Sequence, residues 1–166
     1  MQPPSPWITR FAHLLPTAGQ VLDVACGGGR HGRYFLDRGH GVTAMDKDTS
    51  KLVPQGGLEI IRHDLEDGSP WPLEGRRFAA VVVVNYLHRP LFANLIAAVA
   101  PGGLLLYDTF AKGNEAYGRP SNPDFLLQPG ELRDRVGKEL DIIDYFHGRL
   151  DDPGPAIKQQ ICARRI

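Results

Sequence analysis

The sequence predicts an α/β fold, an open and mostly parallel sheet with helices on both faces. Short β-prone runs alternate with helical segments between residues 6 and 108, at the spacing of strand–helix–strand units. The run Phe78–Val84, "FAAVVVV", shows no alternation, which is typical of a strand buried on both faces. The chain has 166 residues, 42% hydrophobic and 23% charged, so we expect residues 1–166 to form one globular domain.

The first half of the chain supplies three predicted strands. A helix is expected over residues 6–15, where apolar side chains recur at helical spacing and Pro6 fits the first turn. Strands are expected over 21–25, 42–45 and 58–62. A helix is expected over 30–38, before Gly39 and Gly41, and a short one over 48–52 with Asp48 as its N-cap.

The second half begins with the buried strand 78–84 and a helix over 90–100. Pro101–Gly103 then turns the chain into a strand over 104–108. Residues 109–130 form a long loop rich in Gly, Pro and Asn, and a loop of this length is usually functional. "PGELRDRV" predicts a capped helix, and strands over 140–150 and 156–166 form a hairpin through "DDPGP".

Charge and cysteine content argue against several classes of protein. The net charge is +0 and no run of Lys and Arg tracks a phosphate backbone, so no nucleic acid partner is expected. Two cysteines do not make a disulfide scaffold. The N-terminus lacks a signal-peptide pattern, and the apolar stretch 91–107 is interrupted by Asn94 and Pro101–Gly103. We therefore expect a cytoplasmic protein that does not insert into membranes.

A glycine fingerprint lies between the first predicted strand and the following helix. Gly27, Gly29 and Gly32 satisfy G-x-G-x-x-G, and such glycines let a ligand approach the backbone at a helix N-terminus. The motif fits several nucleotide-like ligands, and a tight turn without a ligand would use the same residues.

Asp23, just before these glycines, distinguishes between ligands. A carboxylate here would repel the pyrophosphate of a dinucleotide but attract a cation. S-adenosylmethionine carries an ammonium group and a sulfonium and no phosphate, so it suits this position. Alternatively, Asp23 caps the turn or the following helix.

Two more carboxylates follow the next two strands. Asp46 could accept both hydroxyls of a ribose, in S-adenosylmethionine or in NAD. Asp64 could accept from an adenine amino group with Leu65 beside the ring, or it could simply begin the polar turn of Glu66 and Asp67. In open α/β sheets the carboxyl ends of the strands form the ligand-binding edge.

The stretches "VLDVACGGGRHG", "VTAMDKD", "IRHDLEDG", "FAAVVVVNYLH" and "LIAAVAPGGLLLYD" resemble the class I S-adenosylmethionine-dependent methyltransferases over most of residues 20–108. Ala25 stands where the first glycine of their motif is usual. The resemblance implies a Rossmann-like doubly wound sheet of seven strands with an antiparallel C-terminal strand. "CGGGRHGRYFLDRGHGVTAMDKD" is similar to the small tellurite-resistance methyltransferases.

The resemblance also implies S-adenosylmethionine as cofactor. Asp23 and Gly27 would lie near its methionine part, Asp46 at the ribose and Asp64 at the adenine. The other expected cofactor-binding residues are Ala25, Cys26, Gly29, Arg30, Lys47, His63, Leu65, Asn85, Tyr86 and Leu87.

Methyl transfer from a sulfonium needs alignment of donor and acceptor, and a base only where the nucleophile is protonated. The six histidines show no zinc-ligand spacing, so no metal is expected. We expect the acceptor under the 109–130 loop, and His88 and Tyr86 are the catalytic candidates, although His88 could be a surface residue at a helix start. Cys26 is expected to be a packed side chain, not a nucleophile. Candidates to line the acceptor site are Arg30, His31, Tyr86, His88, Arg89, Thr109, Phe110 and Tyr117.

The expected function is therefore methyl transfer to a small-molecule acceptor, since no additional domain that could grip a large partner is seen. One alternative is an NAD(P)-dependent oxidoreductase that uses Gly27, Gly29, Gly32 and Asp46. Asp23 and the lack of a second mononucleotide-binding half argue against it. The other alternative is a binding module of the same fold without catalytic activity.

Overall fold

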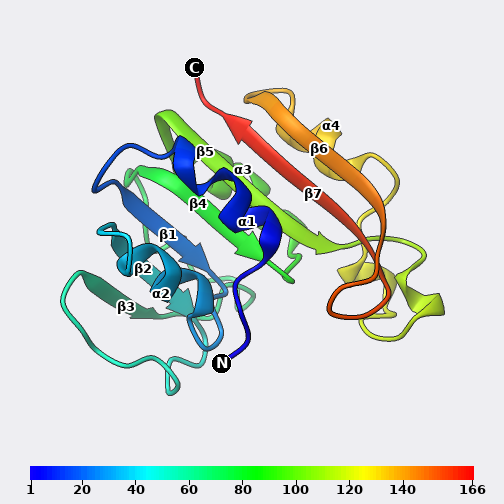
Figure 1. The fold of residues 1–166 in the computed structure, drawn as a ribbon, viewed down its shortest axis with the longest axis horizontal. Coiled ribbons are helices and arrows are strands. Elements are labelled where there is room, and N and C mark those ends of the chain that lie inside the picture. The colour runs from blue at the N-terminus through cyan, green and yellow to red at the C-terminus, as the bar shows by residue number, and fades with distance from the viewer.

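The computed structural model describes residues 1–166 and contains one seven-stranded sheet, in the order β3-β2-β1-β4-β5-β7-β6 (Figure 1). Neighbouring strands from β1 to β5 are parallel, and β7 is antiparallel to both β5 and β6. The predicted mostly parallel sheet and C-terminal hairpin are confirmed. The strands are β1 (Gln20–Val24), β2 (Gly41–Asp46), β3 (Leu58–Arg62), β4 (Phe78–Val84), β5 (Val99–Phe110), β6 (Asp141–Leu150) and β7 (Ala156–Arg164).

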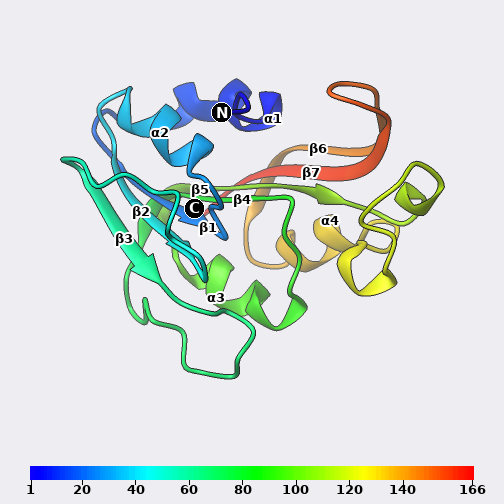
Figure 2. The ribbon, with the colours of Figure 1, turned by 90° about the horizontal axis from the view of Figure 1, so that it is seen from below.

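Helices cover both faces of the sheet (Figure 2). On one face lie α1 (Pro6–Phe11) and α2 (Arg30–Leu36), and on the other lie α3 (Phe92–Ala97) and α4 (Glu131–Val136). Short 3-10 turns complete the set: η1 (Ala12–Leu14), η2 (Arg89–Leu91), η3 (Asn114–Ala116) and η4 (Pro123–Phe125). No helix is both long and apolar enough to cross a membrane.

The unbroken apolar run of β4 serves two cores at once. Val81 and Val83 belong to the core that contains Phe92 of α3, whereas Ala80 and Val82 belong to the core that contains Phe35 of α2. Successive side chains of a strand point to opposite faces, so a strand covered on both faces buries every side chain, which favours an unbroken apolar run.

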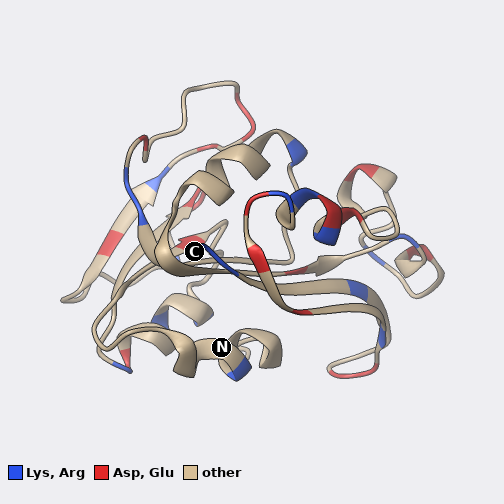
Figure 3. Cartoon of the chain, turned by 90° about the horizontal axis from the view of Figure 1, so that it is seen from above, with Lys and Arg blue, Asp and Glu red and all other residues tan.

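The strand order reverses next to β1, whose neighbours are β2 on one side and β4 on the other. The crevice at the carboxyl ends of strands beside such a reversal is the usual ligand site of open α/β sheets. Acidic and basic residues are interspersed along the chain and do not gather on one face (Figure 3).

Three local predictions were wrong. No helix forms over 48–52, because Asp48 Oδ1 accepts the backbone N–H of Ser50 at 3.0 Å and closes a turn instead. The helix expected over 90–100 ends at Ala97, because β5 already begins at Val99 and continues through Pro101–Gly103 beside a register shift in β4. The 109–130 loop is not structureless, since Ala111 forms a bridge with Leu127 and two 3-10 turns lie between them.

Candidate functional site

A pocket of about 450 Å³ lies at the carboxyl ends of the parallel strands, the edge where the sequence predicts the site. Residues that end or follow β1 to β5 form most of its wall, and two residues of the 111–130 segment complete it. The pocket is lined by Ala25, Asp46, Lys47, His63, Asp64, Leu65, Glu66, Asn85, Tyr86, Leu87, Thr109, Phe110, Pro120 and Phe125.

The glycine turn has the backbone shape that its sequence requires. Ala25, Gly27 and Gly29 all have positive φ, at 51°, 54° and 82°. Gly29 is the N-cap of α2, and a Cβ there would lie 2.7 Å from a methyl group of Leu52. A Cβ on Gly27 or Gly28 would meet nothing within 4 Å. The backbone of this turn therefore borders open space that a ligand can enter.

Asp23 is buried behind the turn, with 2% of its surface exposed. Its Oδ2 accepts the backbone N–H of Gly32 at 3.0 Å, in the first turn of α2. Burial raises the pKa of the Asp23 carboxyl to about 7, against the lowering effects of the Gly32 hydrogen bond and of Arg30. The structure thus shows Asp23 in the capping position, outside the lining of the pocket.

Asp46 ties the glycine turn to the end of β2. Its Oδ2 accepts the N–H of Gly27 at 2.9 Å, and its Oδ1 accepts the N–H of Asp48 at 3.0 Å. Each carboxylate oxygen has two lone pairs, so both can accept a further hydrogen bond from a ligand in the pocket.

Asp64 begins the polar turn and also faces the pocket. Its Oδ1 accepts the N–H of Glu66 at 2.9 Å, which forms the polar turn, and the residue also lines the pocket. Three carboxylates therefore line the pocket, those of Asp46, Asp64 and Glu66, beside Lys47 and His63. This excess of acidic groups favours a ligand that carries positive charge.

Comparison with known proteins agrees with this geometry. No family model matches the chain. A trans-aconitate 2-methyltransferase from Sinorhizobium medicae is 30% identical over 139 residues, which are 79% of this chain and 49% of that protein. TehB from Haemophilus influenzae superposes with a TM-score of 0.74 at 18% identity, over 96% of this chain and 61% of that one.

A 1,6-didemethyltoxoflavin-N1-methyltransferase from Burkholderia thailandensis, solved with S-adenosylhomocysteine bound, gives a TM-score of 0.72 at 21% identity, over 96% of this chain and 76% of that one. The chain has the fold of the class I S-adenosylmethionine-dependent methyltransferases. The predicted resemblance to the class I methyltransferases is confirmed for the fold. The narrower likeness to the small tellurite-resistance methyltransferases is likewise supported for the fold alone. The chain spans less than half of the length of the curated relatives that it matches.

Most residues that the class I resemblance pointed to meet at the pocket. Nine of the expected cofactor-binding residues line it: Ala25, Asp46, Lys47, His63, Asp64, Leu65, Asn85, Tyr86 and Leu87. Gly27 and Gly29 form the turn beside it. Cys26 packs in the core that contains Phe35, and burial raises the pKa of its thiol, as expected for an inert side chain. Arg30 donates to the carbonyl of Pro3 at 2.7 Å.

The pocket brings together only some of the residues predicted to line the acceptor site. Tyr86, Thr109 and Phe110 line the pocket. His31 does not, because it is 4% exposed and its Nε2 accepts the N–H of Ser5 at 3.0 Å. Burial lowers the pKa of His31 to about 4. Tyr117 is 42% exposed and stacks under the guanidinium of Arg149, away from the pocket.

His88 lies beside the pocket but not in its lining. Its Nδ1 is 3.8 Å from Glu66 Oε1, and Glu66 Oε2 accepts the hydroxyl of Tyr86 at 3.1 Å. Burial is the largest cause that raises the pKa of Tyr86, and the charge of Glu66 raises it further. Glu66 therefore orients the side chain of Tyr86, a role that the sequence analysis missed because it assigned Glu66 to a turn.

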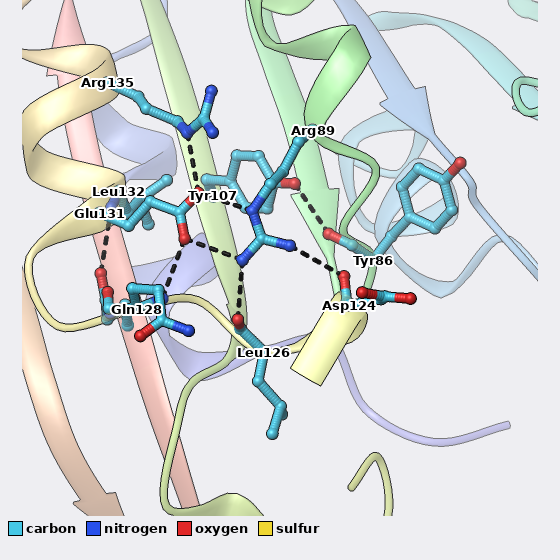
Figure 4. A network of polar contacts seen from close by, with 10 residues as sticks. Tyr86, Arg89, Tyr107, Asp124, Leu126, Gln128, Glu131, Leu132 and Arg135 are labelled. Carbon is cyan, nitrogen blue, oxygen red and sulfur yellow. Dashed lines mark hydrogen bonds and ion pairs between the residues drawn. The ribbon is translucent and has the colours of Figure 1, made fainter. Parts of the chain in front are cut away.

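The prediction that Arg89 lines the acceptor site was wrong, because its guanidinium holds the chain that covers the site (Figure 4). Arg89 Nε and Nη2 donate to both carboxylate oxygens of Glu131, at 2.8 and 2.9 Å. Nη1 and Nη2 donate to the carbonyls of Asp124 and Leu126, at 3.1 and 2.9 Å. Phe125, which lines the pocket, lies between those two carbonyls. We call these contacts the Arg89 brace.

Proposed function

We propose that this chain is an S-adenosylmethionine-dependent methyltransferase that acts on a small-molecule acceptor, with residues 1–166 as one catalytic domain. The observation that carries the proposal is the carboxylate of Asp46. It ends β2, holds the glycine turn and lines the same pocket as Asp64. This arrangement matches a ligand with a diol and an adenine.

The lining residues fit the cofactor part by part. Asp46 would accept the ribose hydroxyls, Asp64 would accept the adenine amino group, and Leu65 would pack beside the ring. The open space at Gly27, in the turn beside the pocket, leaves room for the methionine part. The bound cofactor supplies a methyl group on a positively charged sulfur, which the acidic pocket favours. The protein itself then has to orient the two reactants and exclude water.

A small acceptor is supported by the size of the pocket and by the relatives. About 450 Å³ lies within the range of small-molecule sites. The relatives include methyltransferases named for trans-aconitate and for the malonyl group of an acyl-carrier protein. Trans-aconitate is therefore one of the first acceptors to assay.

Calorimetric titration with S-adenosylhomocysteine and with NADH tests the proposal on wild type, Asp46→Asn and the matched control Asp141→Asn. We expect micromolar binding of S-adenosylhomocysteine and none of NADH. Asp46→Asn should weaken binding by about 10-fold or more, since it removes the charge and replaces one of the two acceptor oxygens with an NH2 group that can only donate. Asp141 is exposed at the start of β6, so its variant should bind like wild type. Binding of NADH alone would contradict the proposal, and binding without turnover of any acceptor would indicate a binding module.

A further inference from the structure

Three polar side chains, those of Asn85, Thr109 and Lys158, meet near the ends of β4, β5 and β7, and Asn85, which the resemblance places beside the cofactor, lines the pocket together with Thr109. Asn85 follows β4, and its N–H donates to the carbonyl of Asp108 at 2.8 Å, which places it beside Thr109 of β5. Lys158 of β7 pairs in register with Phe110 of β5. Strands far apart in the sequence therefore converge on one location.

Lys158 fixes the orientation of the Asn85 amide. The Lys158 ammonium donates to Asn85 Oδ1 at 2.6 Å, lies 3.2 Å from Asp108 Oδ1 and sits 4.6 Å from the centre of the Phe110 ring. An ammonium group can only donate, so the atom that faces it must be the amide oxygen. The amide nitrogen of Asn85, which has no partner in the protein, is then available to donate to a ligand in the pocket.

Thr109 supplies a second polar group to the same wall. The residue lines the pocket and is only 1% exposed. A threonine hydroxyl has one hydrogen to donate and lone pairs to accept, so a ligand that reaches it can pair with it. Asn85 and Thr109 together therefore offer donors to a ligand that brings oxygen acceptors.

The groups near this wall are poorly suited to remove a proton from a nucleophile. The Tyr86 hydroxyl already donates to Glu66, and His88 lies outside the lining, 3.8 Å from the same carboxylate. Phe110, Pro120 and Phe125 are apolar, whereas the titratable residues of the lining end or follow β2 and β3, which β1 and β4 separate from β5: Asp46, Lys47, His63, Asp64 and Glu66. A nucleophile that is already ionised at neutral pH needs no base.

We propose that the methyl acceptor is a carboxylate with a flat apolar body, an inference that rests on the proposed function. The carboxylate oxygens accept hydrogen bonds from the Asn85 amide and the Thr109 hydroxyl, and the body packs against Phe110 and Phe125. One carboxylate oxygen forms a bond to the methyl carbon while the carbon–sulfur bond breaks and its electron pair stays on sulfur. The products are a methyl ester and a thioether, and no proton moves. Two opposite charges are neutralised in this step, and the apolar side chains of Phe110 and Phe125 beside the acceptor favour that loss of charge.

Three compounds that share one carbon skeleton and differ in their head group test whether the acceptor is a carboxylate: trans-cinnamate, cinnamamide and cinnamylamine. We would measure methyl transfer by product mass, and binding of each compound to the protein loaded with S-adenosylhomocysteine by calorimetry. Trans-cinnamate should bind and be converted to its methyl ester, with kcat/KM about 100-fold or more above those of the other two.

Variants then assign the contacts. Thr109→Val should weaken cinnamate binding by about 5- to 10-fold, the usual effect of one lost hydrogen bond. Asn85→Asp replaces the donor with a negative charge and should shift the binding preference from cinnamate toward cinnamylamine, which a merely structural role would not do. Thr17→Val, on an exposed turn at the opposite edge of the sheet, is the matched control and should behave like wild type.

The outcomes separate the two proposals. Failure to bind S-adenosylhomocysteine overturns both the proposed function and the carboxylate inference. Binding of S-adenosylhomocysteine together with transfer to the amine overturns the carboxylate inference alone. So does the absence of any binding or methylation of cinnamate in the same protein.

Discussion

Glu131→Gln should destabilise the protein by an amount that depends on pH. Burial alone would raise the pKa of Glu131, but hydrogen bonds from Arg89, from the N–H of Gln128 and from Arg135 outweigh burial and lower the pKa from 4.5 to about 2. At about 1.4 kcal/mol per pH unit, this difference stabilises the folded state by about 3 kcal/mol at neutral pH. Arg135 is 40% exposed, and solvent screening reduces the expected value to about 2 kcal/mol.

The direction of the pH dependence follows from the lowered pKa. The stabilisation is complete well above pH 4.5, where the carboxyl is ionised in both states, and it is lost as pH falls toward 2. About 1 kcal/mol should already be lost at pH 4. The glutamine of the variant would keep the shape of the side chain but lack the charge, so the stability of the variant should not show this loss.

Urea unfolding of wild type, Glu131→Gln and Glu139→Gln at pH 7, 5 and 4 measures the effect. Glu139 is exposed and forms no ion pair, so it controls for the loss of one carboxylate. The gap between wild type and Glu131→Gln should be about 2 kcal/mol at pH 7 and should narrow at pH 4. A gap that is negligible at pH 7, or the same at every pH, would refute the reasoning.

Three other substitutions have definite expected outcomes. Asp23→Asn should raise the free energy of unfolding at pH 8 by about 1 kcal/mol or more. The reason is that the folded-state pKa of Asp23 is raised to about 7, so its carboxyl disfavours folding at a pH where it is ionised in the unfolded chain. Urea unfolding should show this gain at pH 8 and no such gain at pH 4. Ala25→Val should lower the unfolding free energy by about 1–2 kcal/mol, since a branched side chain is strained at φ 51°, whereas Ala25→Gly should change it by less; thermal unfolding of both variants checks this. Arg89→Lys should make the 111–130 segment more sensitive to limited proteolysis, because lysine cannot replace four directed hydrogen bonds, and equal cleavage rates would contradict the role of the brace.

The parts of the site that lie at strand ends could be predicted from the sequence. Parallel strands bring their carboxyl ends to one edge, so Asp46, Asp64 and Asn85 gather there whatever the details of packing. The fold could also be predicted from the sequence, because the alternation of strands and helices is visible along the chain. The short helix expected over 48–52 failed because a local turn at Asp48 competes with the first turn of a helix.

The parts that depend on distant pairs could not be predicted. Arg89 follows a strand that ends at the site, so its position suggests a site residue, but its partner Glu131 lies 42 positions away on α4. Lys158 reaches the pocket edge only because β7 runs beside β5. No local pattern of residues encodes either contact, since each depends on how the two halves of the sheet are joined.

The place of β7 in the sheet has a consequence for synthesis of the chain. β7 lies between β5 and β6 although it follows both in sequence, so the sheet remains open until residues 156–164 have left the ribosome. Until then β5 presents an unpaired edge to other chains, and such edges promote aggregation. The strands that carry the cofactor side of the pocket emerge first, whereas Lys158 arrives last. A nascent chain would therefore acquire its cofactor side before its acceptor side.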